Sequence, residues 1–275
     1  MALQDLWSGV DPEVSKRSWI PSALRARFQL LVFNPGGKRL SETRMVARRT
    51  TLLDALMSRI TINAIPEPNR ATFEILSDLN LGQFYLGGGT GLALQIGHRY
   101  SIDFDLFSEN NQLRTDDRLK LKNLLSSKGD IEVLMEKDGT LALLLNNINV
   151  TFFYYPYPII EPGPVHRTLK IASITDIALM KLSAVVNRGN KKDFIDLYFI
   201  IKDCISLDQL LHLTKEKFRD ARDFAVQALR ALTYFFDADL DPMPKMIKPV
   251  EWERVKNFFL KQSKIISLRN FEIDL

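Results

Sequence analysis

Apolar residues recur along the chain at two spacings, which predict a mixture of helices and strands. Three- and four-residue spacing predicts a helix from Thr50 or Thr51 to Ile60 and another from Ala71 to Leu79. Asp116 is expected to cap a third helix over 117–126. Strand-like runs are expected at 84–86, 131–134, 140–145 and 148–155, with a hairpin turn at 137–139. Mixed strands with helices packed against them favour an α/β (α+β) core.

Beyond Pro164 the pattern is helical. Ser173, with Asp176 three residues later, resembles a capping box at the start of one helix, and Gly189 ends it. The helices expected here are 174–188, 191–202, 207–217, 219–236 and 250–261. The chain is therefore divided into an N-terminal extension (1–50), an α/β core (51–165) and a helical C-terminal domain (166–275).

A glycine-rich turn lies at the start of the most informative segment, residues 86–107. Gly88 and Gly89 lack a Cβ, so their backbone N–H groups can approach a phosphate closely. Thr90 is expected to cap the helix that follows, and Gly97 to end it. The positive end of that helix would face the same anion.

Two aspartates follow this helix at a fixed distance. Asp103 and Asp105 are one residue apart in an apolar run, so a strand places both carboxylates on one face. That pairing is unfavourable unless a divalent cation lies between them. The linking residues Arg99 and Ser101 then come beside the phosphate and are candidate nucleotide contacts. The structural alternatives are a solvated edge strand, and a capping or Glu109-pairing role for His98 and Arg99.

These motifs together resemble a known family. A hydrophobic residue, Gly-Gly and then Asp-x-Asp is the signature of the DNA polymerase β-like nucleotidyltransferase superfamily. The runs at 88–95 (Gly-Gly-Thr-Gly-Leu-Ala-Leu-Gln), 97–107 and 191–198 (Lys-Lys-Asp-Phe-Ile-Asp-Leu-Tyr) look more closely like the AbiEii/AbiGii toxin nucleotidyltransferases. Residues 233–239, Trp252 and 255–259 are similar to that family's C-terminal signature. The resemblance runs from about residue 52 to the C-terminus.

The resemblance implies a polymerase β-like core with a mixed sheet, and a specific reaction. A nucleoside monophosphate would pass from an NTP to an acceptor hydroxyl with the help of Mg²⁺ or Mn²⁺ held by Asp103 and Asp105. The acceptor implied is RNA, notably tRNA, and a cognate antitoxin would restrain the toxin. Modification of a protein side chain, or an inactive nucleotide-binding or interaction module, stays open. Asp-x-Asp alone also fits a sugar-nucleotide transferase, whereas the glycines do not fit the dinucleotide-binding spacing.

Lys181 is the most informative cation of the helical domain. It falls on an apolar helix face, where an unpaired ammonium would be costly. Either its head reaches water along the surface, or, as the family resemblance suggests, it meets nucleotide phosphates. Arg188 lies on the same face seven residues later and is a candidate second phosphate contact.

The next helix carries a Lys-Asp-x-x-Asp element. Asp193 and Asp196 share a face opposite the packing stripe, and Lys192 is within reach of Asp196. A surface ion pair is the structural interpretation. The resemblance instead implies that Lys192 binds phosphate and that Asp193 or Asp196 is the general base for the acceptor hydroxyl.

A third carboxylate, common on a later strand of polymerase β-like enzymes, is missing from the expected place. Asn149 and Thr151 stand there and carry no charge. Either two aspartates suffice, with phosphate and water completing the metal shell, or another acid reaches in from beyond Pro164. Aromatic residues of the helical domain, such as Phe218, Phe224 and 234–236, are expected in the core rather than stacked on bases.

Composition and charge refine this interpretation. The 275 residues are 46% hydrophobic and 25% charged, and the one cysteine excludes an internal disulfide or a thiolate cluster. Neither a signal peptide nor a membrane span is recognisable, so a cytoplasmic protein is expected. Residues 1–50 hold nine Lys or Arg against four Asp or Glu, a surplus of 5 positive charges. Because the whole chain has a net charge of +4, the remaining 225 residues carry −1. This basic segment is either an attractor for polyanions or a solvated, partly disordered terminus.

Overall fold

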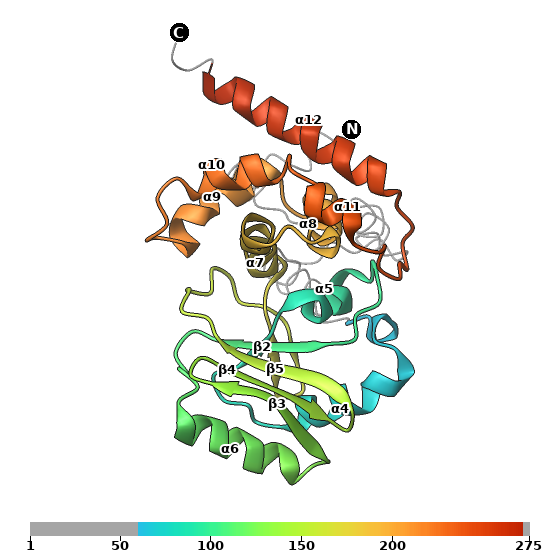
Figure 1. The fold of residues 1–275 in the computed structure, drawn as a ribbon, viewed down its shortest axis with the longest axis vertical. Helices are drawn as coiled ribbons and strands as arrows, with labels where there is room; N and C mark the ends of the chain where they lie inside the picture. Colours follow the sequence, from blue (N-terminus) through green and yellow to red (C-terminus); the bar gives the residue numbers. More distant parts are fainter. Residues whose placement is uncertain (1–59, 272–275) are drawn as a thin grey trace, which may run out of the picture.

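The structure, a computed structural model, describes residues 60–271. The N-terminal extension and the helix expected to end at Ile60 lie outside the described residues. Figure 1 shows that the described chain forms two parts, a sheet with flanking helices and a set of helices stacked on it.

One mixed sheet holds all the strands of the described region. Its seven strands lie in the order β3-β4-β5-β2-β1-β7-β6. They are β1 (Tyr85–Leu86), β2 (Phe104–Ser108), β3 (Ile131–Lys137), β4 (Thr140–Leu145), β5 (Ile148–Tyr154), β6 (Val165–His166) and β7 (Leu169–Ile171). The predicted hairpin is confirmed as β3 and β4, turning at Gly139 with φ +79°. No sequence pattern predicts β6 and β7, and β7 pairs in parallel with β1, so the sheet extends past residue 165.

Nine α-helices and one 3₁₀ turn are described. They are η2 (Ile62–Ala64), α4 (Glu67–Asp78), α5 (Gly88–Ile96), α6 (Thr115–Ser126), α7 (Ile174–Asn187), α8 (Lys191–Asp203), α9 (Leu207–Lys217), α10 (Phe224–Ala231), α11 (Phe236–Leu240) and α12 (Trp252–Phe271). Two predicted ends are confirmed: the Ser173 hydroxyl accepts the Asp176 N–H, and Gly97 ends α5 with φ +56°. The expected cap Asp116 instead lies inside the first turn of α6.

The single helix expected over 219–236 is wrong. The chain there forms α10 and α11 with a break between them, and Asp223 just before α10 has a left-handed backbone, φ +58°. After α10 the Thr233 hydroxyl donates to the Arg230 carbonyl at 2.8 Å, which offers the backbone an alternative to the helix. The last helix, α12, continues ten residues beyond its expected end at Lys261.

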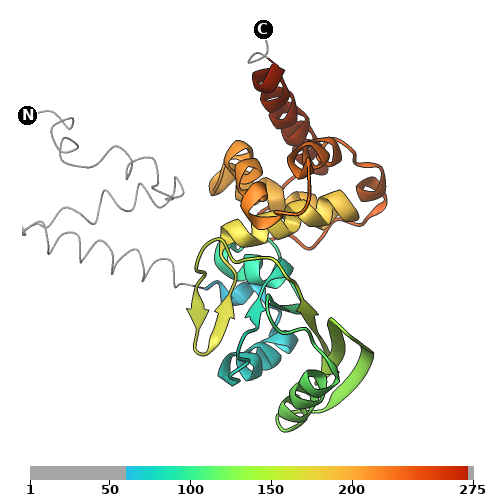
Figure 2. The same cartoon turned by 90° about the vertical axis from the view of Figure 1, so that its left-hand side faces the viewer.

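Two faces of the sheet are used differently. Helices α4 and α6 cover one face, where alternating strand residues such as Phe104, Leu143 and Phe152 are fully buried with Phe73 and Leu125. The opposite face carries Asp105, and α5 and α7 lie over part of it, with the remaining C-terminal helices stacked behind them (Figures 1 and 2). The mixed sheet and the helical part that follows it confirm the expected fold class.

Candidate active site

The glycine turn after β1 lies directly over Asp105. The Gly87 N–H donates to the Asp105 carbonyl at 2.9 Å. Gly88 has φ +58°, and a Cβ placed on it would lie 2.7 Å from Asp105 Oδ2. A residue with a side chain would therefore be strained there and would collide with the carboxylate. Close contact between backbone and carboxylate is the structural reason for glycine at this position.

Thr90 does not cap α5, contrary to the expectation from the sequence. Gly87 holds the cap position, and Thr90 is buried in the first turn. Its hydroxyl lies 2.8 Å from Ser101 Oγ and also donates to the Asp103 carbonyl. Thr90 and Ser101 therefore tie the glycine turn to the aspartate strand from inside the protein.

Asp105 lies in β2 and Asp103 immediately precedes that strand, and both are beside β5. Asp105 pairs in register with Thr151, and Asn149 Nδ2 donates to Asp103 Oδ1 at 3.3 Å. Burial raises the pKa of the Asp105 carboxyl, and repulsion from Asp103 adds to the rise. Within residues 60–271 no cluster of three acidic, His or Cys side chains is arranged to hold a metal, so a third acid does not join this pair.

Lys181 is buried and makes two carboxylate contacts. Its Nζ lies 2.8 Å from Asp193 Oδ1 and 2.7 Å from Asp196 Oδ2. Burial by itself lowers the pKa of Lys181, but the two carboxylates outweigh that effect and raise it. The alternative in which the ammonium head reaches water is wrong for this structure.

Asp196 receives more donors than any surface ion pair would supply. His98 Nε2 lies 2.7 Å from Oδ1, and Arg99 reaches both carboxylate oxygens, with Nε at 2.6 Å and Nη2 at 2.8 Å. Burial alone would raise the pKa of Asp196, yet Lys181 and Arg99 hold it well below its ordinary value. The expected surface pair of Asp196 with Lys192 is wrong, because Asp196 is fully buried.

Asp193 is fully buried as well and holds a second cation. Arg188 Nε donates to Asp193 Oδ2 at 3.0 Å, while Lys181 contacts the other oxygen. Burial alone would raise the pKa of Asp193, but Lys181 and Arg188 lower it. Both aspartates of α8 are therefore enclosed, and each is paired with two cations.

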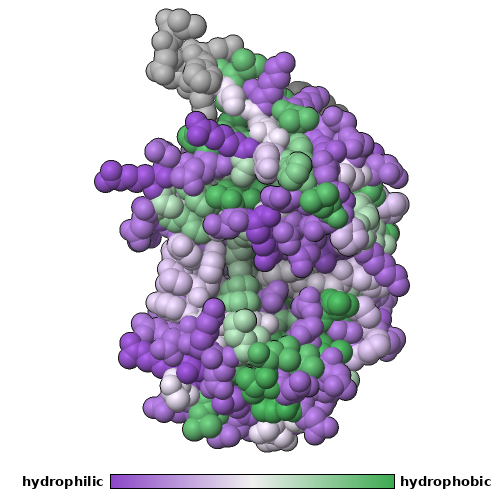
Figure 3. Space-filling model, viewed as in Figure 1, coloured by the Kyte–Doolittle hydropathy of each residue, from purple (hydrophilic) through white to green (hydrophobic). Residues whose placement is uncertain are grey.

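Two cations of the α7–α8 connection remain on the surface. The Arg188 side chain is 55% exposed, and Lys192 is exposed at the start of α8. Their charges, together with Lys181, act against the rise of the Asp105 pKa. Cations of the helical part therefore lie near the carboxylates of the sheet part. Figure 3 shows a hollow between the two parts on the face that it draws.

The structure gives two predicted nucleotide contacts an internal role. Arg99 is 5% exposed and donates to both carboxylate oxygens of Asp196. Its guanidinium lies so close to Gly89 that a Cβ placed there would collide with it. Ser101 is bonded to Thr90. His98 and Arg99 as partners of Asp196 were missed from the sequence, since they lie 98 and 97 residues away and carry no local signal of that pairing.

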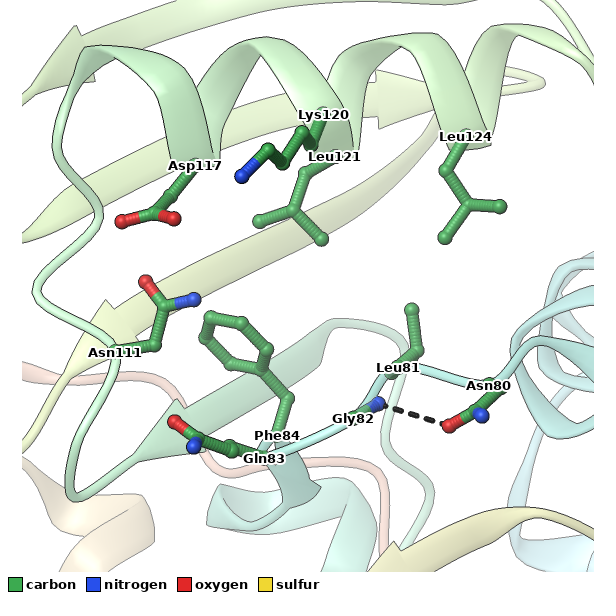
Figure 4. A pocket seen from close by; sticks show the side chains of 10 residues that line it. All are labelled: Asn80, Leu81, Gly82, Gln83, Phe84, Asn111, Asp117, Lys120, Leu121 and Leu124. Atoms are coloured by element: carbon green, nitrogen blue, oxygen red, sulfur yellow. Dashed lines mark hydrogen bonds between the residues drawn. The ribbon is translucent and has the colours of Figure 1, made fainter.

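A separate shallow pocket of about 270 Å³ lies between the start of β1 and α6. Figure 4 shows it lined by Gln83, Asn111, Asp117 and Lys120, with Leu121 among its apolar residues. Gln83 precedes β1 and Asn111 follows β2, so the pocket is at the opposite end of these strands from Gly88 and Asp105.

In the described residues, no helix is long and apolar enough to span a bilayer.

Several known proteins are similar to this chain. The Aquifex aeolicus (strain VF5) protein aq_aa25, an uncharacterized protein, is 35% identical over 201 residues, which are 72% of this chain and 95% of that protein. JHP933 from Helicobacter pylori is 18% identical with a TM-score of 0.47, covering 76% of this chain and 96% of its own. MenT4, the nucleotidyltransferase toxin Rv2826c from Mycobacterium tuberculosis H37Rv, is 14% identical with a TM-score of 0.48, covering 77% and 89%.

The family comparison spans both parts of the structure. The model of the family described as nucleotidyl transferase AbiEii toxin, type IV TA system, matches residues 74–265, which include the glycine turn, both strand aspartates and the α7–α8 cations. This stretch covers well over half of the 275 residues. The chain therefore belongs to the AbiEii toxin family of nucleotidyltransferases.

Proposed function

We propose that the protein transfers a nucleoside monophosphate from an NTP to a hydroxyl group of RNA, with tRNA as a candidate acceptor. The observation that carries the proposal is the arrangement of Asp103 and Asp105 beside the Gly88 turn, near Arg188 and Lys192. A glycine turn with carboxylates and cations nearby is better suited to binding a metal-bound triphosphate than a neutral ligand. Family membership supports the donor chemistry.

The donor set of Asp103 and Asp105 fits a hard divalent cation. The Asn149 side chain donates to Asp103, and the pKa of Asp105 is raised first by burial and then by repulsion from Asp103, both of which a bound cation would offset. Asp103 and Asp105 would hold Mg²⁺ or Mn²⁺, which when bound supplies positive charge for the phosphates. Asn149 in place of a third acid leaves the remaining positions to water and phosphate.

The residues of the helical part act on the phosphates through charge. Arg188 and Lys192 face the solvent at the α7–α8 connection and would neutralise charge on the triphosphate. We assign Asp193 and Asp196 to positioning, because they are buried and hold Lys181, Arg188 and Arg99 in place. Their lowered pKa values make them poor bases, so this role replaces the general-base role expected from the sequence.

Labelled transfer tests this function. The full-length protein is incubated with α-³²P-labelled NTPs, Mg²⁺, and either total RNA or total protein, and the expected result is label in RNA. Asp105→Asn should reduce this transfer by about 100-fold or more, the loss that follows removal of one preorganised charged group. Asp130→Asn is the matched control, because Asp130 is an exposed aspartate of the α6–β3 connection.

Other outcomes would decide against the proposal. Label in protein would make the acceptor a side chain, with the same donor chemistry. No label in either polymer would favour an inactive module, consistent with the uncharged Asn149. Equal transfer by Asp105→Asn and by the unmodified protein would remove the metal-binding role from the aspartate pair. A cognate antitoxin, which family membership implies, should suppress the transfer or its effect.

A further inference from the structure

Three large hydrophobic residues are exposed on the surface of the helical part. Tyr234 is 60% exposed, Phe236 66% and Leu240 78%, and we call them the aromatic platform. The two rings have centroids 6.4 Å apart and planes inclined at 33°. Phe236 and Leu240 are four residues apart in α11 and share a face. The sequence pattern predicts these aromatics in the core, and for Tyr234 and Phe236 that is wrong.

The break between α10 and α11 explains why the platform is exposed. Phe218 and Phe224, at the start of the same stretch, are 2% and 8% exposed and do lie in the core. After α10 ends at Ala231, the chain turns and only Phe235 points inward, with its ring 5.2 Å from Phe194. Its neighbours on both sides are left in solvent. Because the Phe235 ring packs against Phe194, the rings of Tyr234 and Phe236 on either side of it are kept on the surface.

The platform is anchored at the same helix end as the phosphate-facing cations. Leu240 is followed by Asp241, whose Oδ2 accepts the Lys191 N–H at 2.9 Å. Lys191 begins α8, and the next residue, Lys192, is an exposed cation. Figure 1 shows α11 beside α8, and the two helices are in contact. A polymer that reaches the active site can therefore reach the platform as well.

The charge of the helical part favours a polyanion as the occupant. Residues 166–271 hold 19 Lys or Arg against 13 Asp or Glu, whereas residues 60–165 hold 8 against 13. One of the three acids of the platform region is paired with a cation, because Asp239 accepts from Trp252 Nε1 at 2.6 Å and from Lys256 Nζ at 3.2 Å. The Asp241 carboxylate accepts the backbone N–H of Lys191 at 2.9 Å, which uses it to fix the start of α8. Asp237 is exposed.

We propose that the aromatic platform binds the single-stranded segment next to the acceptor hydroxyl of an RNA substrate, with bases stacked on Tyr234 and Phe236. Exposed aromatic rings beside cations are the usual means of holding single-stranded nucleic acid, because every base has a stacking face and every nucleotide a phosphate. This proposal rests on the proposed function for the identity of the acceptor. It adds the surface that selects a single strand and orients its end toward Asp103 and Asp105.

Direct binding tests the platform independently of transfer. The probe is a fluorescein-labelled single-stranded RNA of about ten nucleotides with a free 3′ hydroxyl, titrated without NTP and followed by fluorescence anisotropy. Tyr234→Ala and Phe236→Ala should each raise the Kd by roughly ten-fold or more, the typical size of one lost stacking contact. Val226→Ala is the control, because Val226 is 48% exposed on α10 and outside the platform. Phe236→Trp should bind as the unmodified protein does, and Phe236→Leu should not.

The remaining outcomes separate the platform from the reaction. An unchanged Kd in both alanine variants would overturn the platform, as would equal binding by Phe236→Leu. A change of oligomeric state in Phe236→Ala, seen by light scattering without an RNA effect, would make the occupant a second copy of the chain. If platform variants lose RNA binding while no protein transfers label, the platform stands and the proposed transfer fails. If these variants bind RNA normally while the unmodified protein labels it, the transfer stands and the platform fails.

Discussion

The Arg99 guanidinium donates to both oxygens of the Asp196 carboxylate, with Nε 2.6 Å from Oδ1 and Nη2 2.8 Å from Oδ2, although the two residues are 97 positions apart in the sequence. Arg99 follows α5, and Asp196 lies in α8, so this contact joins the sheet part to the helical part. The same carboxylate holds Lys181, which also contacts Asp193. The placement of the helical part on the sheet part therefore depends on this buried charge network as well as on apolar packing.

Replacing Asp196 should destabilise the protein strongly. Asp196→Asn leaves Lys181 and Arg99 with less compensating charge, and we expect a loss of about 3 to 5 kcal/mol in the free energy of unfolding at pH 7, measured by urea titration. Asp203→Asn, an exposed aspartate at the end of the same helix, should change it by less than about 0.5 kcal/mol. Equal stability of the two variants would contradict the network.

The pH dependence of that loss follows from the lowered pKa of Asp196. A carboxyl whose pKa is lower in the folded than in the unfolded state contributes its stability fully above the unfolded value, about 3.9, and loses it as the pH falls further. The difference between the unmodified protein and Asp196→Asn should therefore be constant near neutral pH and narrow below about pH 4. A difference that grew in acid would have the wrong sign.

Gly88 should be required for activity through its contact with Asp105. Gly88→Ala places a Cβ 2.7 Å from Asp105 Oδ2 at φ +58°, so we expect displaced carboxylate and reduced label transfer. Gly82→Ala has a similar strain, φ +63°, but meets no atom within 4 Å. Both substitutions should cost about 1 kcal/mol in unfolding free energy from the backbone, and only Gly88→Ala should lower transfer. Equal activities would separate the glycine from the site.

Lys217 and Asp176 form a second buried ion pair, far in sequence from the site. Lys217 Nζ lies 2.7 Å from Asp176 Oδ1, and both side chains are almost completely buried. Lys217→Met should lower the unfolding free energy by about 3 kcal/mol or more, because Asp176 is left without a cation. The double variant Asp176→Asn/Lys217→Met should recover much of that loss. Lys215→Met, at an exposed position on the same helix, is the control.

Cys204 should be unreactive in the folded protein. Burial raises the pKa of its thiol to about 11, so at pH 8 it holds roughly 100-fold less thiolate than a thiol of pKa 9. Alkylation by iodoacetamide, followed by mass spectrometry, should be slow until denaturant is added. Because the chain has one cysteine, the label count is unambiguous. Rapid modification without denaturant would contradict the burial of the thiol.

Local patterns in the sequence were enough to predict much of the fold. The Ser173 cap, the Gly97 end and the β3–β4 hairpin depend on residues a few positions apart, and each is confirmed. The short strands β6 and β7 could not be predicted this way. Their two and three residues are too few to show a repeating alternation, and they form strands because β7 pairs with β1 and β6 pairs with β7.

The sequence by itself determined the family motif and the two aspartates, because Gly88, Asp103 and Asp105 are fixed by spacing within one βαβ-like stretch. Only the tertiary structure decided which charges face solvent. Helical periodicity placed Asp193 and Asp196 opposite a packing stripe, but α8 is buried almost all round, so both carboxylates became internal partners of Lys181. A sequence shows which residues share a helix face, whereas the packing of other elements determines whether that face meets water. The exposure of Tyr234 and Phe236 has the same cause, since it depends on where the chain turns after α10.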